Sequence, residues 1–346
     1  MAPRNCTGNS GDVGDTVLQT SLVRSLLNRT LFPQLATVHW WGTKWVVDQL
    51  FPDLPDNVTV HTWNGDAATL PGPKDVGRFG IGAILVCTRD PAVMSALSAN
   101  TKIPCSPSAP LDANSSQHLC RQLHTCLSGL GLHVSDFPEP RIVVGRDEAR
   151  SAKKQISPQP LAKRSTRWIE GVQDFRPLVD RVFLVNPAIG EREDKRTWPA
   201  DTWRTLVEYL AGVGVVIVSY NPKDPSEKSA AESILGSGTT FKSRYAIGLS
   251  LRELAAYSCA STVCIVRDSG PMHVMAAAVG PQGRPKVLGL VSVMNPATWR
   301  PLSAHFESMG EWPLPLRACL TPEQVAVRAA TMAQIDVGVS VSKIGA

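Results

Sequence analysis

The second half of the chain alternates short runs of consecutive apolar residues with longer stretches in which apolar residues recur every three or four positions. The first pattern is typical of buried strands and the second of amphipathic helices. The runs predict strands at 182–186, 213–220, 262–266 and 286–291. The intervening stretches predict helices at 200–211, 227–235, 251–259 and 271–279. This alternation predicts parallel βαβ units with right-handed crossovers, and therefore a doubly wound α/β sheet.

The first half shows the same α/β pattern in a less regular form. Residues 17–27 and 119–130 have helical spacing, while 81–87 and 141–144 are predicted strands. A polar, proline-containing stretch from 145 to 179 follows. We interpret this stretch as the connection between two domains, together with one helix.

Length and composition agree with two folded domains. A chain of 346 residues exceeds the size at which a single hydrophobic core usually stops growing. Apolar residues make up 43% and charged residues 19%, which is typical of a globular protein. We expect one α/β domain over 1–165, connection included, and a second over 166–346 that ends in a helix.

Charge and hydropathy limit the partners and the location. The 35 basic and 30 acidic residues give a net charge of +5, which is too small to require a nucleic-acid partner but suits an anionic substrate or membrane surface. No run approaches the roughly 18 apolar residues of a membrane span, and the polar start lacks the apolar core of a signal peptide. We expect a cytoplasmic protein, and peripheral association with the inner face of the membrane stays open.

Metal-binding patterns are not found in the sequence. The eight cysteines form no C-x-x-C pair and no spacing typical of a zinc site. No D-x-D motif follows a predicted strand in a context suited to a metal-bound diphosphate. We therefore expect reduced, structural thiols and no metal.

The strongest local signal lies where a predicted strand runs into a polar turn. Asp268, Ser269 and Gly270 fill the turn, and Pro271 begins the next predicted helix. Unpaired N–H groups and partial positive charge suit such a helix N-terminus to a diphosphate, and the glycine allows a ligand to come close. The structural alternative is that Asp268 or Ser269 caps the helix and His273 packs on its first turn.

Residues 268–280 resemble the D-(S/T)-G-x-x-H-x-x-x-A segment of glycosyltransferase family 9, the heptosyltransferases that build the inner core of lipopolysaccharide. Three more segments are similar to motifs of that family. They are the strand, loop and K-R-W-P helix entry at 186–199, the G-x-(S/T)-L-x-E-L run at 248–254 and the start of the C-terminal helix at 320–325. The resemblance extends over about 180–335.

This resemblance implies the GT-B architecture, in which two Rossmann-like domains face a cleft. It implies an inverting, metal-independent glycosyltransferase of lipopolysaccharide biosynthesis, with an acceptor-side first domain and a donor-binding second domain. The implied donor is a nucleotide diphosphate sugar, ADP-heptose, which is a substrate, and no cofactor is expected. The implied acceptor is a glycan or glycolipid such as lipopolysaccharide core, while another glycan or a protein remains open.

The resemblance also assigns residues to the donor. Lys195 matches the lysine of the family's K-R-W-P motif, and we expect it to neutralise the charge that accumulates on the leaving nucleoside diphosphate. One residue is inserted here, so Arg196 is the alternative for this role, and the structural alternative is an exposed lysine before a helix. The expected donor-binding residues are Asn186, Lys195, Arg196, Asp268, Ser269, Gly270, Pro271 and His273.

Residues 14–24 resemble the family's G-D-V-(V/L)-x-T-x-P-x-(L/V)-R segment, whose aspartate is regarded as the general base. On that register Asp15 deprotonates the acceptor hydroxyl as it attacks the anomeric carbon opposite the leaving group. Two alternatives stay open. Asp15 caps a helix that begins near Val17, or Asp12, in a second Gly-Asp pair, is the base.

The chain departs from the family pattern in two places. Residues 1–13 are polar and glycine-rich where the family has a hydrophobic strand, so we expect the first strand to be missing or replaced. Residues 290–296 stand in place of the family's F-G-x-T-x-P turn but lack its glycine and threonine. We expect altered nucleotide contacts at this turn.

Four tryptophans cluster in the first half, and for these we favour a core or interdomain role over stacking against a sugar. They are Trp40, Trp41, Trp45 and Trp63.

Two rival functions are compatible with these patterns. One is a non-catalytic nucleotide-sugar-binding protein that has lost the base. The other is an enzyme similar to nucleotide-sugar epimerases on the same two-domain plan.

Overall fold

The computed structural model describes residues 13–26, 38–42, 44–62, 74, 78, 84–85, 95–96, 105–106, 115–129, 138–156, 181–187, 196–236, 244–292 and 294–334. The chain divides into two compact units. The first comprises Met1–Ile142 and Asn295–Ser303, and the second comprises Val143–Met294 and Ala304–Ala346. The dividing point therefore lies earlier than residue 165, where the composition placed it. None of the described helices is long and apolar enough to cross a membrane.

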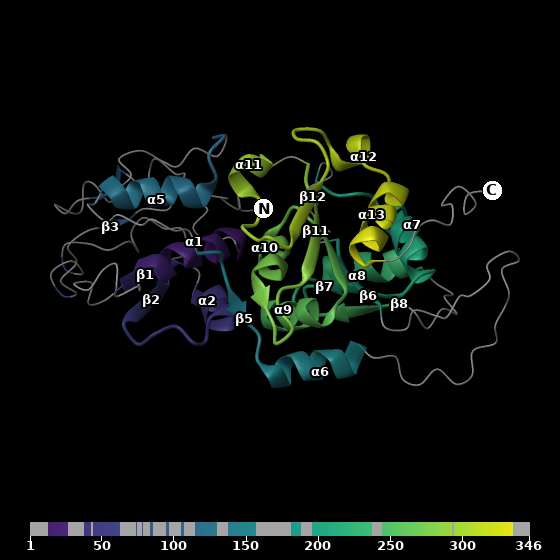
Figure 1. Ribbon diagram of the computed structural model, residues 1–346, viewed down its shortest axis with the longest axis horizontal. Coiled ribbons are helices and arrows are strands. Elements are labelled where there is room, and N and C mark those ends of the chain that lie inside the picture. The colour runs from purple at the N-terminus through teal and green to yellow at the C-terminus, as the bar shows by residue number, and fades with distance from the viewer. Residues whose placement is uncertain are drawn as a thin grey trace, which may run out of the picture. The chain divides into compact units, whose positions relative to one another are not determined.

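The second unit is built on a six-stranded parallel sheet in the order β12-β11-β9-β6-β7-β8. The sheet lies among the helices of this unit, drawn in teal to yellow in Figure 1. The strands are β6 (Val182–Asn186), β7 (Val215–Tyr220), β8 (Arg244–Gly248), β9 (Val263–Arg267), β11 (Lys286–Leu290) and β12 (Phe306–Met309). Every residue of the central strands β6 and β9 is buried, as expected for a parallel sheet covered on both faces. The predicted doubly wound sheet is confirmed.

Helices cover both faces of this sheet. On one face, α7 (Ala200–Ala211), α8 (Pro225–Leu235) and α13 (Pro322–Met332) share a core with alternate strand residues such as Val185 and Ile265. On the other face lie α9 (Leu251–Ala260) and α10 (Gly270–Ala277), and the Cys264 thiol of β9 points to the Ser258 carbonyl of α9. A short helix, α12 (Leu316–Cys319), precedes α13.

The helix in the connection, α6 (Arg146–Ile156), belongs to the second unit and packs on α9 (Figure 1). Its apolar side, Ala152 and Ile156, is buried. Just before it comes β5 (Ile142–Val143), after which the Val144 N–H donates to the carbonyl of Val279 in β10 (Ala278–Val279).

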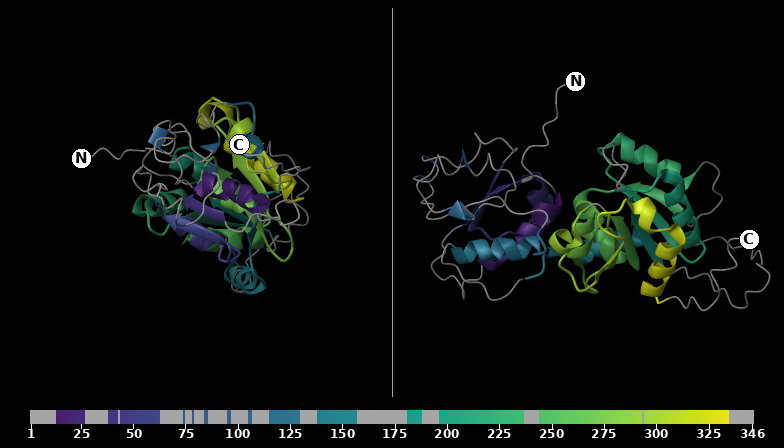
Figure 2. Two further views of the ribbon diagram at one scale, coloured as in Figure 1. Left: turned by 90° about the vertical axis from the view of Figure 1, so that its left-hand side faces the viewer. Right: turned by 90° about the horizontal axis from the view of Figure 1, so that it is seen from above.

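The described residues of the first unit contain two pairs of parallel strands, one of which is shown in purple in Figure 2. The first pair is β1 (Val38–Gly42) with β2 (Val58–Thr62), and the second is β3 (Ile84–Leu85) with β4 (Cys105–Ser106). Its helices are α1 (Val13–Leu26), α2 (Lys44–Leu50), α5 (Leu119–Gly129) and α11 (Pro296–Trp299). Residues 1–12, where we expected no ordinary first strand, lie outside the described residues.

The tryptophans of the first unit have different surroundings. Trp40 is buried, and its indole N–H donates to Gln19 Oε1 at 3.1 Å. Trp41 stacks on His61 with 4.3 Å between ring centroids. Trp45 is 53% exposed, so the expected core role is wrong for this residue. Trp63 lies outside the described residues.

The segment 295–303 leaves the second unit after β11 and completes the first. The Asn295 amide donates to the Ser115 carbonyl at 3.2 Å. His118 Nε2 lies 2.7 Å from the Arg300 carbonyl, and His118 Nδ1 accepts from the Cys120 N–H. Since the carbonyl needs a donor and the N–H an acceptor, this imidazole is neutral, in keeping with a pKa that burial lowers.

Candidate functional site

Three buried polar side chains meet the carboxyl edge of the sheet in the second unit. Asn186 is the last residue of β6, Asp268 directly follows β9, and Ser292 follows β11 by two residues. Asn186 is aligned with Val266, and Leu290 with Arg267, so these strands end at the same level. Ligands bind at this edge in open α/β sheets. Buried polar groups gathered there make it the candidate site.

Asn186 is held by β7. Its Nδ2 donates to Ser219 Oγ at 3.0 Å and to the Ser219 carbonyl at 3.3 Å. The Ser219 hydroxyl donates its own proton to the Val185 carbonyl. Asn186 Oδ1 is buried and has no hydrogen-bond partner among the described residues. The amide is therefore fixed with its acceptor oxygen unused.

The N-terminus of α10 also lies at this edge. Ser269 is its N-cap residue, with extended backbone, but no side chain caps the helix. The Ser269 hydroxyl instead donates to the Arg267 carbonyl at 3.1 Å. Ser269 therefore occupies the N-cap position without capping the helix through its side chain, and a helix N-terminus of this kind favours an anion. His273 is buried in the first turn, as the structural alternative expected.

An electrostatic interaction between a half-buried acidic residue and a buried arginine was not predicted. Arg267, 9% exposed, ends β9, and Glu227 lies in the first turn of α8. Burial raises the pKa of Glu227, while the Asn221 N–H that it accepts at 2.7 Å and the charge of Arg267 act in the opposite direction. The only sequence signal was a charged residue at the end of an apolar strand run.

The remaining candidates are only partly placed. Lys195 and Asp12 lie outside the described residues. Arg196 is half-buried and lies shortly before α7. Asp15 lies within α1, and its side chain is outside the described part. Since α1 includes Asp15, the idea that Asp15 caps a helix beginning near Val17 is wrong.

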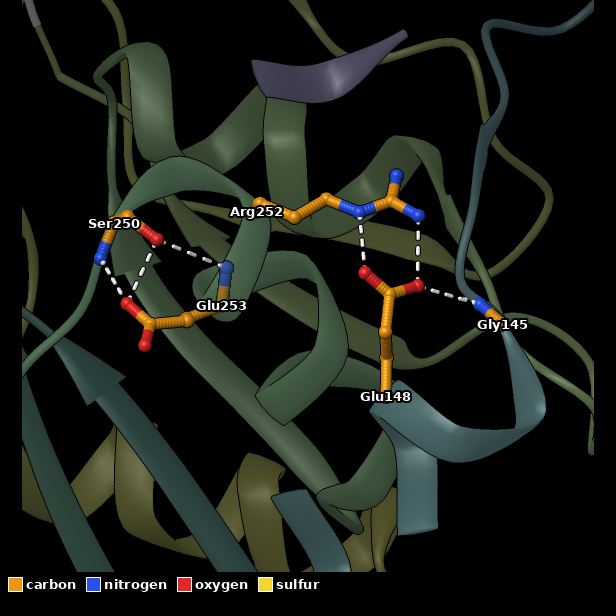
Figure 3. A network of polar contacts seen from close by, with 5 residues as sticks. All are labelled: Gly145, Glu148, Ser250, Arg252 and Glu253. Carbon is orange, nitrogen blue, oxygen red and sulfur yellow. Dashed lines mark hydrogen bonds and ion pairs between the residues drawn. The ribbon is translucent and has the colours of Figure 1, made fainter. Parts of the chain in front are cut away.

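The segment 248–254 proves to be a helix start that also anchors α6 (Figure 3). Ser250 and Glu253 form a capping box, in which the Ser250 hydroxyl accepts from the Glu253 N–H and the Glu253 carboxylate accepts from the Ser250 N–H. Arg252 forms two hydrogen bonds of 2.7 Å with the Glu148 carboxylate of α6. Glu148 also accepts the Gly145 N–H, which holds its pKa low together with Arg252.

The segment 320–325 has the same kind of structural role. Thr321 and Gln324 form a second capping box, and Pro322 takes the first position of α13. Among the described residues, no three His, Cys, Asp or Glu side chains are grouped as a metal site requires.

A parallel α/β sheet with polar groups and a helix N-terminus at its carboxyl edge is the arrangement of a nucleotide-binding enzyme. Comparison with known protein families identifies the family to which the chain belongs within this class. Residues 113–326 match the model of glycosyltransferase family 9 (heptosyltransferase). The chain belongs to this family.

Three solved structures are similar over most of their length. E. coli ADP-heptose LPS heptosyltransferase II has 17% identity and a TM-score of 0.68, over 94% of this chain and 96% of that one. A family 9 glycosyl transferase from Veillonella parvula has 18% identity and a TM-score of 0.65, over 93% and 94%. E. coli heptosyltransferase WaaC, solved with ADP, has 12% identity and a TM-score of 0.59, over 92% and 97%. These likenesses confirm the two-domain GT-B fold, whereas no curated protein matches the chain.

Proposed function

We propose that this glycosyltransferase moves a heptose from ADP-heptose to a glycan or glycolipid such as lipopolysaccharide core, with inversion at the anomeric carbon. The observation that carries this proposal is the start of α10, where the N-cap residue Ser269 makes no side-chain cap and where Asp268 and Asn186 are buried at the same edge of the sheet. Such an end favours a diphosphate. Family membership and two relatives named as heptosyltransferases support the choice of sugar.

In this mechanism the donor lies along the carboxyl edge of the sheet in the second unit. The N–H groups at the start of α10 face the diphosphate, with Gly270 allowing close approach and Pro271 fixing the first turn. When ionised, Asp268 can only accept hydrogen bonds, and in this mechanism it accepts them from hydroxyl groups of the nucleotide sugar. His273 supports the turn from within the fold.

Two further charges complete the proposed chemistry. Lys195, or Arg196 in the alternative alignment, neutralises the diphosphate as the glycosidic bond breaks. Asp15 removes the proton of the attacking acceptor hydroxyl. Because these groups and the helix end supply the required charges, we propose transfer without a metal. We further propose that a lipid-linked acceptor brings the enzyme to the membrane surface.

The test is a transfer assay with the full chain, ADP-heptose and lipopolysaccharide core that lacks heptose, read by mass spectrometry. UDP- and GDP-sugars serve as alternative donors, and a parallel arm contains EDTA. We expect acceptor mass to increase by one heptose, with and without EDTA. Donor binding without transfer to any acceptor would favour the non-catalytic binder, and a changed sugar without transfer would favour an epimerase-like enzyme. Flotation with anionic vesicles tests membrane contact.

A further inference from the structure

Ser292 places an unpartnered hydroxyl at the candidate site. Its side chain is 0% exposed, and its Oγ has no hydrogen-bond partner among the described residues. Buried polar atoms in native proteins are nearly always paired, so such an atom needs an explanation. The hydroxyl lies beyond the end of β11, next to the strand that carries Asp268.

The fold itself does not require this hydroxyl. Ser292 lies in the segment 290–296, which stands in place of the family's F-G-x-T-x-P turn. The backbone around it is held by other bonds: the Asp268 N–H donates to the Leu290 carbonyl, and the Val291 N–H to the Met309 carbonyl. The serine therefore adds a polar group to a strand end that is already satisfied.

Asn186 supplies a second, independent observation on the other side of β9. Its amide orientation is fixed, because the Ser219 carbonyl can only accept and the Ser219 hydroxyl has given its proton to Val185. The unpartnered atom is thus Oδ1, which can only accept. A phosphate oxygen cannot satisfy it, whereas a ligand hydroxyl can.

We propose that Ser292 is a specificity-determining residue whose hydroxyl bonds to a sugar hydroxyl of the donor. This inference rests on the proposed function, since it assumes a nucleotide sugar at this edge. A serine hydroxyl both donates and accepts, as a sugar hydroxyl does, so the two groups match without charge. The sugar is either the ribose of the nucleotide or the transferred sugar.

The test is Ser292→Ala in the full chain, with affinities for ADP and ADP-heptose measured by calorimetry. Loss of one neutral hydrogen bond weakens binding about 2- to 12-fold. The melting temperature should stay unchanged or rise, because an unpartnered buried hydroxyl is removed. Ser292→Gly, which also removes the hydroxyl, should weaken binding to a similar extent.

The matched control is Ser258→Ala. Ser258 is also fully buried in the second unit, but its hydroxyl donates to the Leu254 carbonyl at 2.7 Å. We expect this variant to bind both ligands normally. Weaker binding by Ser292→Ala together with normal binding by Ser258→Ala would show that the effect comes from a contact with the ligand. It would exclude a general effect of removing a buried hydroxyl.

The two ligands identify the source of the bound hydroxyl. Equal weakening for ADP and ADP-heptose assigns the contact to the ribose, and weakening for ADP-heptose alone assigns it to the transferred sugar. Unchanged affinity for both ligands in both Ser292 variants would overturn the inference and leave the proposed function standing. A wild-type chain that binds neither ligand would refute the proposed function and this inference with it.

Discussion

The ion pair between Glu148 and Arg252 allows a quantitative prediction about how the connection is held. Arg252 Nε and Nη2 each lie 2.7 Å from a Glu148 oxygen, and the two side chains are 38% (Glu148) and 21% (Arg252) exposed (Figure 3). Exposed pairs contribute about 0.2 to 1 kcal/mol, and bidentate charged bonds contribute more. Because Glu148 remains partly in solvent, we expect a coupling free energy of about 1 kcal/mol.

The cap at the start of α6 is a separate contribution. Glu148 also accepts the Gly145 N–H at 2.7 Å, and loss of such a cap costs about 0.5 to 2 kcal/mol. A double-mutant cycle with Glu148→Ala and Arg252→Ala removes this contribution from the coupling term, since only the first variant loses the cap.

The assay is hydrogen exchange of the α6 amides in the full chain, which reports local opening of this helix. The hydrogen bonds from Arg252 hold the pKa of Glu148 below 4.5, so the stabilisation is present above that pH. It should disappear as the pH falls from 4.5 through the lowered pKa of the folded state. The control cycle uses Lys228 and Glu232 of α8, an exposed pair 3.9 Å apart, for which we expect almost no coupling. A coupling below about 0.3 kcal/mol at pH 7, or one that persists in acid, would refute the reasoning.

Three further predictions concern chemistry and stability. Asp15→Asn should retain donor affinity but lose roughly two to four orders of magnitude in transfer rate, with Asp12→Asn as the register control; a dead Asp12→Asn and an active Asp15→Asn would move the base by one Gly-Asp pair. Lys195→Ala should lower turnover about a hundredfold or more, as measured by single-turnover kinetics. A normal rate for Lys195→Ala together with a lowered rate for Arg196→Ala would contradict this prediction. Gly310→Ala should cost at least about 1 to 3 kcal/mol in urea unfolding, because φ is +119° and an added Cβ would lie 1.9 Å from a carbonyl oxygen; a stable variant would show that this turn relaxes.

The sequence predicted the central part of the second unit well and its borders poorly. Strands such as β6 and β9 consist of apolar residues buried on both faces, a pattern visible without tertiary information. The outer strands β8 and β12 were missed because their residues are only partly buried and mix polar with apolar types. The helix α6 was assigned to the wrong unit, since its attachment depends on the long-range contact between Glu148 and Arg252.

The candidate site was predictable only where it is contiguous. The turn from Asp268 to Gly270 follows from a strand, a polar turn and a helix start in succession. The hydrogen bonds of Asn186 with Ser219, and the effect of the Arg267 charge on Glu227, depend on how neighbouring strands and helices are placed, which no local pattern specifies. Conversely, two of the residues shared with the family at 248–254, Ser250 and Glu253, form a capping box, a structural role that depends only on local spacing.

The excursion of 295–303 into the first unit determines how this enzyme can be divided or recombined. A fragment that ends at residue 142 would lack the segment whose Asn295 and Arg300 contact Ser115 and His118. A fragment that starts at Arg181 would keep that segment without its partners and would also lose α6. Chimaeras that exchange the first unit between relatives therefore need two simultaneous grafts, one of the residues up to 142 and one of the segment 295–303.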